Sequence, residues 1–201
     1  MMAYRLGVLT GDGIGPEIVE ATMRVLEAAQ QRDSRLQFEW VPLPIGWEAI
    51  RKMGNAIPES TVEALEKCDA WIMGPHDSAS YPAAEREKLN PSGTLRHRFD
   101  LYANIRPARA YPGLPAVSPK MDLVIVRENT EGFYTDRNMA WGIGEVMPTP
   151  DVALTLGKIT RHASERIART AFALARQRRK KVAIVHKANV MTKIYGLWME
   201  T

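Results

Sequence analysis

Short apolar runs alternate with amphipathic stretches along the first half of the chain. The apolar runs at residues 4–9, 38–42 and 70–73 have the length of buried strands. A helix is predicted to begin near Pro16, and shorter helices at 48–53 and 59–67. The apolar stripe expected on the first helix comprises Ile18, Ala21, Val25, Leu26 and Ala29. This alternation predicts an α/β fold with a parallel, doubly wound sheet and flanking helices.

The second half of the chain continues the pattern with one interruption. Strands are predicted at 123–126 and 182–185, and a helix at 162–177. Between residues 136 and 160, glycines and prolines break the apolar pieces, which indicates strands or a protruding arm.

Charged side chains follow the strands of the second half. Arg127 comes directly after the run 123–126, and Lys187 holds the same position after 182–185. Arg96 lies on a predicted helix and Arg106 just past a short apolar run. Ligands of open α/β sheets bind at the carboxyl ends of strands, and arginine matches the geometry of carboxylates. These cations therefore suit a small polyanion, although each could instead be a solvated surface residue.

Composition and charge narrow the class of protein. The chain has 201 residues, 45% of them apolar and 25% charged, as in ordinary globular proteins. No apolar run has the length of a membrane span or a secretory signal, so we expect a cytoplasmic protein without a membrane partner. The basic run at 176–181 is read as the end of a helix rather than a nucleic-acid site, because no aromatic platform accompanies it.

Four motifs together resemble one family. They are GDGIGPE (11–17), LYANIRPAR (101–109), VIVRENTEGFY (124–134) and HKAN (186–189). The chain thereby resembles the metal-dependent, β-decarboxylating 2-hydroxyacid dehydrogenases of the isocitrate/isopropylmalate dehydrogenase family. The resemblance implies an isopropylmalate dehydrogenase-like fold of two interleaved domains. Residues 1–100 would be the incomplete, nucleotide-side domain, and 101–201 the dimer-forming domain with a clasp arm at about 136–160.

The resemblance also implies roles for individual side chains. Arg96, Arg106 and Arg127 would bind the carboxylates of a malate-type hydroxy acid, Lys187 would act as general base, and Tyr134 would donate a proton. Hydride would pass to NAD, with NADP possible, and Mg²⁺ or Mn²⁺ would polarise the hydroxyl. In the family's homodimer, Tyr134 of one subunit faces the equivalent of Lys187 from the other.

Two further residues bear on ligand choice. Ser92 stands one turn ahead of Arg96 and favours a polar substituent, as in isocitrate or homoisocitrate, over the isopropyl group of 3-isopropylmalate. Alternatively, Ser92 satisfies backbone groups near the start of a helix. Asn189, within HKAN, is a candidate contact to the cofactor.

The length of the chain departs from the resemblance, because members of the family are much longer. Their metal-binding aspartates would lie beyond Thr201, so no metal ligand is expected in this chain, and the C-terminal third of the fold is expected to be absent. The alternative to a catalyst is a non-catalytic or truncated member that acts as a regulatory or binding subunit.

Overall fold

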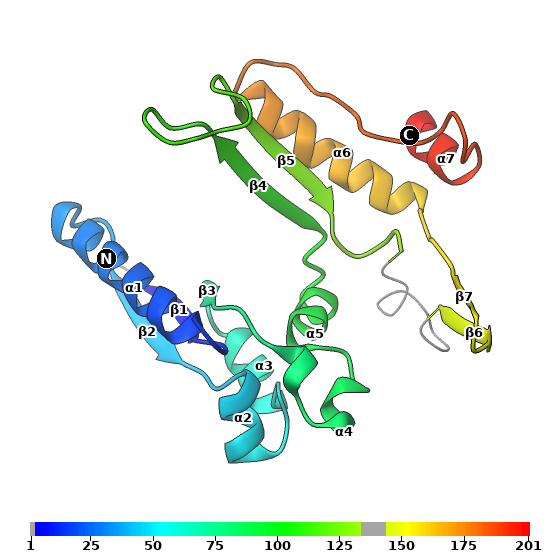
Figure 1. Ribbon diagram of the computed structural model, residues 1–201. Coiled ribbons are helices and arrows are strands. Elements are labelled where there is room, and N and C mark those ends of the chain that lie inside the picture. Colours follow the sequence, from blue (N-terminus) through cyan, green and yellow to red (C-terminus); the bar gives the residue numbers. More distant parts are fainter. Residues whose placement is uncertain (1–2, 134–143) are drawn as a thin grey trace. The chain divides into compact units, whose positions relative to one another are not determined.

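A computed structural model describes residues 3–133 and 144–201 of the chain. The chain folds into two compact units, Met1–Leu95 and Arg96–Thr201 (Figure 1). Within the described ranges, every helix is too short or too polar to cross a membrane.

The first unit is built on a parallel sheet, as the sequence predicts. Its strands are β1 (Tyr4–Leu9), β2 (Phe38–Pro42) and β3 (Ala70–Met73), in the order β2-β1-β3. Both pairings of the central strand β1 are parallel. The alternation of strands and helices therefore gives the expected α/β architecture.

Helices connect and follow the strands of this sheet along the chain. They are α1 (Gly15–Arg32), α2 (Gly46–Met53), α3 (Glu59–Leu65), the 3₁₀ helix η1 (Ser78–Ser80), α4 (Ala83–Arg86) and α5 (Pro91–Arg98). Leu9, Ile45 and Leu65 are almost fully buried. The stripe predicted for α1 is partly wrong, since Ile18 and Val25 are 44% and 69% exposed. Val19 is buried instead, because α1 turns a neighbouring face toward β3.

The second unit contains an antiparallel ribbon with a helix along it. Strands β4 (Ala103–Arg109) and β5 (Asp122–Glu128) pair antiparallel, and α6 (Arg161–Arg176) runs beside β5 (Figure 1). A second antiparallel pair, β6 (Glu145–Thr149) and β7 (Val152–Thr155), lies within the predicted arm. The last helix is α7 (Ile194–Glu200). The strands expected between 136 and 160 thus include one hairpin, whereas its role as a clasp stays a prediction.

The strand predicted at 182–185 is wrong. Residues 181–187 have no regular secondary structure, and Val185 is 92% exposed. A β-branched run becomes a strand only beside another strand that accepts its backbone hydrogen bonds, and no described strand pairs with this one. Arg106 also differs from expectation, because it lies within β4 rather than after an apolar run.

Candidate functional site

Arg106 and Arg127 lie on the same face of the β4–β5 ribbon. The register pairs Asn104 with Arg127, and Arg106 with Ile125. Residues directly opposite, or two apart on one strand, project to the same face. The two arginines are therefore diagonal neighbours, a relation that separates positions by roughly 7–8 Å. The structure thus brings together two cations that the sequence singled out.

Asn104 completes this group, which we call the Arg106–Asn104–Arg127 face. The Nε of Arg106 donates a hydrogen bond of 2.9 Å to Oδ1 of Asn104. Arg106 is exposed, and Arg127 is half-buried. Two guanidinium groups with an amide beside them suit a ligand that carries carboxylates. Sequence reasoning missed Asn104, although its spacing of two from Arg106 on a strand is a usable signal.

The turn that follows β5 is held by acidic side chains. The Glu128 carboxylate accepts from the backbone N–H groups of Thr130 and Glu131, at 2.8 and 2.6 Å. Glu131 in turn accepts from the N–H and the hydroxyl of Thr160, both at 2.8 Å. Gly132 and Lys158 form an isolated antiparallel bridge beside these contacts. The two ends of the predicted arm are therefore tied together at its base, while Tyr134 lies outside the described residues.

Ser92 and Arg96 both lie on α5, four residues apart and thus on one side of the helix. The backbone N–H of Ser92 donates to Nε2 of His76 at 3.2 Å. The side chain that receives a backbone N–H of the first turn is Asn90, whose Oδ1 accepts from Gly93 at 2.8 Å. Asn90 thus caps one N–H group at the start of α5, and both roles considered for Ser92 stay predictions.

Lys187 and Asn189 are exposed. Because the strand 182–185 is not formed, Lys187 does not have the strand-end position that the sequence predicts. Its carbonyl accepts from the N–H groups of Val190 and Met191, which begins the turn before α7. The roles of Lys187 as base and Asn189 as cofactor contact stay predictions.

The glycine turn after β1 is packed against the loop that follows β3. A Cβ atom at Gly11 would lie 2.1 Å from the Pro75 carbonyl oxygen, and one at Gly15 would lie 2.2 Å from that of Thr10. The backbone approaches so closely that these glycines serve the turn and do not form a cradle for a phosphate.

Asp12, between these glycines, is a buried carboxylate that accepts several hydrogen bonds, and sequence reasoning missed it. Its carboxylate accepts from the N–H groups of Trp47 and Asp77 at 2.8 and 3.0 Å, and from the Tyr81 hydroxyl at 2.5 Å. Burial, with the hydrogen bond to Asp12, raises the pKa of Tyr81 well above its usual range. An aspartate in a tight glycine turn is a sequence signal for such a role.

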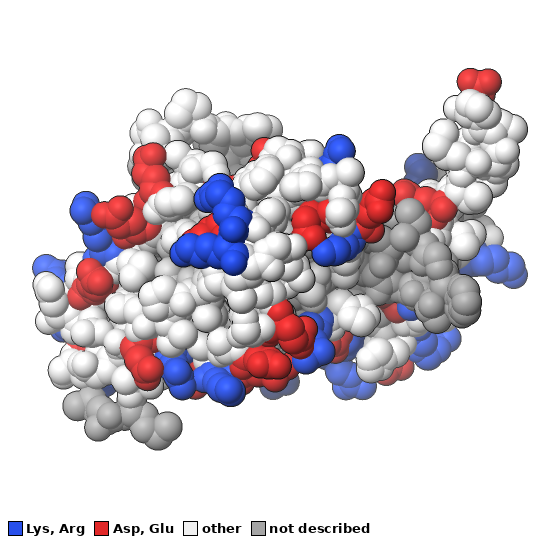
Figure 2. All heavy atoms as spheres, turned by 90° about the horizontal axis from the view of Figure 1, so that it is seen from below, with Lys and Arg blue, Asp and Glu red and all other residues white. Residues whose placement is uncertain are grey.

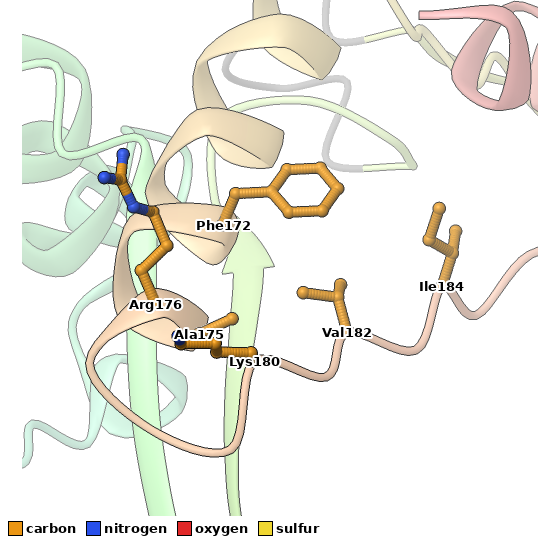
Figure 3. Close-up of a pocket in the computed structure, with 6 residues that line it drawn as sticks. All are labelled: Phe172, Ala175, Arg176, Lys180, Val182 and Ile184. Carbon is orange, nitrogen blue, oxygen red and sulfur yellow. The ribbon is translucent and has the colours of Figure 1, made fainter.

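No metal centre marks the predicted site in the part of the chain that the structure describes. No group of three or more His, Cys, Asp or Glu side chains there could hold a metal ion. A pocket of about 270 Å³ lies beside the end of α6 (Figure 3). Its lining is Phe172, Ala175, Arg176, Lys180, Val182 and Ile184. None of these is a predicted site residue.

The basic run 176–181 takes part in contacts within its own unit. Arg178 donates to Oδ1 of Asp122 at 2.5 Å, and Arg179 donates to the Asp122 carbonyl oxygen. The hydrogen bond from Arg178 lowers the pKa of Asp122. On the face drawn in Figure 2, acidic and basic side chains are interspersed. These contacts give the run a structural role at the end of α6.

Comparison with known sequences extends the resemblance to the whole chain. The sequence model of the family described as isocitrate/isopropylmalate dehydrogenase matches residues 5–201. An isocitrate/homoisocitrate dehydrogenase of Thermus thermophilus is 41% identical over 202 residues, which cover 100% of this chain and 55% of the relative. A 3-isopropylmalate dehydrogenase of Archaeoglobus fulgidus is also 41% identical, over 98% of this chain and 54% of its own length. The chain spans about half the length of the curated relatives it matches.

A solved structure shares the fold. The isocitrate dehydrogenase of Methylococcus capsulatus superposes with a TM-score of 0.81 at 34% sequence identity. The match covers 98% of this chain and 55% of that one.

Proposed function

Because the chain belongs to the isocitrate/isopropylmalate dehydrogenase family, an oxidoreductase family, we propose that its protein catalyses the oxidative decarboxylation of a malate-type 2-hydroxy acid. Hydride would pass from the carbon that bears the hydroxyl to NAD, or to NADP, as in the family. The observation that carries the proposal is the Arg106–Asn104–Arg127 face, which presents two guanidinium groups on one side of a ribbon.

The chain's own residues would bind the acid and move its protons. Arg106 and Arg127 would each hold a carboxylate, with Arg96 as a third contact, so that the reacting carbon is fixed. Lys187 would take the proton of the 2-hydroxyl. Loss of carbon dioxide from the resulting β-keto acid leaves an enolate, whose carbon would receive a proton from Tyr134. Arg106, Arg127, Tyr134 and Lys187 all lie within the motifs that match the family.

The described residues do not by themselves fit a metal ion or a nucleotide phosphate. They contain no cluster of acidic, histidine or cysteine side chains for Mg²⁺ or Mn²⁺, and the glycines at 11 and 15 are occupied by backbone contacts. The metal, the nicotinamide cofactor that would accept the hydride, and the contact of Asn189 to it therefore rest on family membership.

We also propose a homodimer in which the two subunits complete each other's site. The support is the family resemblance together with the arm, whose base is closed by the Gly132–Lys158 bridge and which carries the β6–β7 hairpin. Mixed dimers of Tyr134→Phe and Lys187→Ala subunits should recover part of the activity that each variant alone has lost. Absence of any recovery would contradict shared sites.

A polar third substituent on the substrate is favoured by Ser92. At the start of α5 the side chain of Asn90, not that of Ser92, accepts the hydrogen bond from the Gly93 N–H. A panel of isocitrate, homoisocitrate and 3-isopropylmalate, each assayed with NAD and NADP in the presence of Mn²⁺, tests the proposal. Turnover of isocitrate or homoisocitrate is expected, and a clear preference for 3-isopropylmalate would contradict the role of Ser92.

A binding subunit without turnover is the second candidate. The observation in its favour is that the described residues form no group that could hold a metal ion. Such a subunit would bind a hydroxy acid without reducing NAD or NADP. Calorimetry beside the same substrate panel therefore separates the two functions.

A further inference from the structure

Arg166 lies on α6 but contacts the segments that carry all three predicted carboxylate-binding arginines. Its Nη1 donates to Oδ2 of Asp100 at 2.6 Å, and its Nη2 donates to Oγ1 of Thr130 at 2.9 Å. The guanidinium also stacks over the ring of Tyr102, 4.6 Å from the ring centre. Only 19% of its side chain is exposed. One cation thus links α6 to three points of the second unit.

Each of these contacts lies close in sequence to one of the arginines. Asp100 follows Arg96 by four residues, at the end of the turn that leaves α5. Asp100 has a left-handed backbone with φ of 45°, which a residue with a side chain rarely adopts without support. The ion pair with Arg166 supplies such support, so the geometry of this turn depends on α6.

The other two contacts stand at the ends of the ribbon strands that bear the site. Tyr102 directly precedes β4 and lies four residues before Arg106. Thr130 binds Glu128, the last residue of β5 and the neighbour of Arg127, through a hydroxyl contact of 2.6 Å. Nη2 of Arg166 also lies 3.7 Å from the Glu128 carboxylate. The contacts to Glu128 and Thr130 fix the end of β5 from the side of α6.

The register shows that Arg166 acts from the face opposite the site. Glu128 alternates with Arg127 along β5 and therefore projects to the other side of the ribbon. Arg166 does not reach a ligand bound on the Arg106–Asn104–Arg127 face, but it holds the backbone from which that face projects. We infer that Arg166 is a positioning residue that sets the spacing of the carboxylate-binding arginines. This inference rests on the proposed function for its ligand, a malate-type dicarboxylate.

Only a guanidinium can make this set of contacts. Its planar fork donates to Asp100 and Thr130 in two directions while its face lies on Tyr102, whereas the ammonium of lysine is a single point charge. Arg166→Lys should therefore keep the charge but lose the simultaneous contacts. Arg169 offers a matched control, because it is an exposed arginine on the same helix.

The test measures binding of malate by calorimetry to the unmodified protein and to its variants. Arg166→Met should weaken malate binding by about tenfold or more, Arg166→Lys by a smaller factor, and Arg169→Met by less than about twofold. A merely structural role would lower the fraction of folded protein, and hence the number of binding sites, without changing their dissociation constant. Unchanged affinity in the folded fraction of both Arg166 variants would overturn the inference.

Two further measurements test the inference if Arg166→Met does not fold or if the unmodified protein does not bind malate. If Arg166→Met does not fold, Thr130→Val removes one partner of Arg166 from the opposite side and should weaken malate binding in the same direction. If the unmodified protein binds no malate, the proposed function fails, and ¹⁵N relaxation of the Nε–H groups of Arg106 and Arg127 decides the inference without a ligand. Greater side-chain motion in Arg166→Lys than in Arg169→Met supports positioning, and equal motion overturns it.

Discussion

The Tyr81 hydroxyl donates a hydrogen bond of 2.5 Å to Oδ2 of Asp12, 69 positions earlier in the chain. Tyr81 is buried, and the Asp12 carboxylate also accepts hydrogen bonds from the backbone N–H groups of Trp47 and Asp77. The glycine turn, the start of α2 and the loop after β3 therefore share one carboxylate. These contacts of Asp12 give the glycine turn after β1 a structural role.

Tyr81→Phe should destabilise the protein by about 1.5–3 kcal/mol, the usual contribution of a hydrogen bond to a charged group. The substitution keeps the ring, which packs edge-on against Trp47, and removes only the donor. Denaturant unfolding measures the loss. Tyr111→Phe is the control, because Tyr111 is 62% exposed. Equal stability of the two variants would contradict the role of the hydroxyl.

The same contact predicts a loss of stability in alkali. Because the folded state raises the pKa of Tyr81, it holds the phenolic proton more tightly than the unfolded chain does. This contribution is complete below the unfolded pKa of about 10 and is lost as the pH rises toward the folded value. The free energy of unfolding, measured from about pH 9 to pH 11, should fall more steeply with pH in the parent protein than in Tyr81→Phe. Parallel curves would contradict the prediction.

Two glycines of the turn should differ in their tolerance of alanine. Both have left-handed backbones, with φ of 74° at Gly11 and 56° at Gly13. A Cβ at Gly11 would meet the Pro75 oxygen at 2.1 Å, but one at Gly13 meets nothing within 4 Å. Gly13→Ala should therefore cost only the conformational term of about 1–2 kcal/mol. Gly11→Ala should lose clearly more stability, measured by thermal unfolding. Similar losses of stability in the two variants would contradict the close packing at Gly11.

The pKa of Asp122 should rise when its partner is removed. The hydrogen bond from Arg178 lowers this pKa, so the pair contributes stability above the unfolded pKa and loses it as the pH falls through the folded value. A ¹³C NMR titration of Asp122 should give a higher pKa in Arg178→Gln than in the parent. Arg176→Gln is the control from the same basic run, and it should leave the titration almost unchanged.

Local patterns were sufficient to predict the strands of the first unit. The runs that became β1, β2 and β3 are short, apolar and separated by helical stretches, so composition and spacing agree on one answer. The run at 182–185 is also short and apolar but has no neighbouring strand among the described residues, and it remains irregular. Strand formation depends on a partner that a local pattern does not supply.

Contacts between residues that are distant in the chain could not be predicted from the sequence. Arg127 and Arg106 were each recognised, but the pairing of Asn104 with Arg127 depends on the ladder register, which the connection between β4 and β5 sets. Arg166 was missed because a helical arginine is usually solvated. Its spacing of three from Ala163 and four from Thr170 places it on the inner stripe of α6, where a cation needs partners.

The most direct test of the central claim compares malate binding by Arg127→Met and Arg109→Met. Arg127 lies on the proposed ligand face, whereas Arg109 projects from the opposite face of the same ribbon. Loss of one charge-assisted contact should weaken binding by about tenfold or more in Arg127→Met, with a change below about twofold in Arg109→Met. Equal losses in the two variants, or no binding by the parent protein, would contradict the carboxylate site.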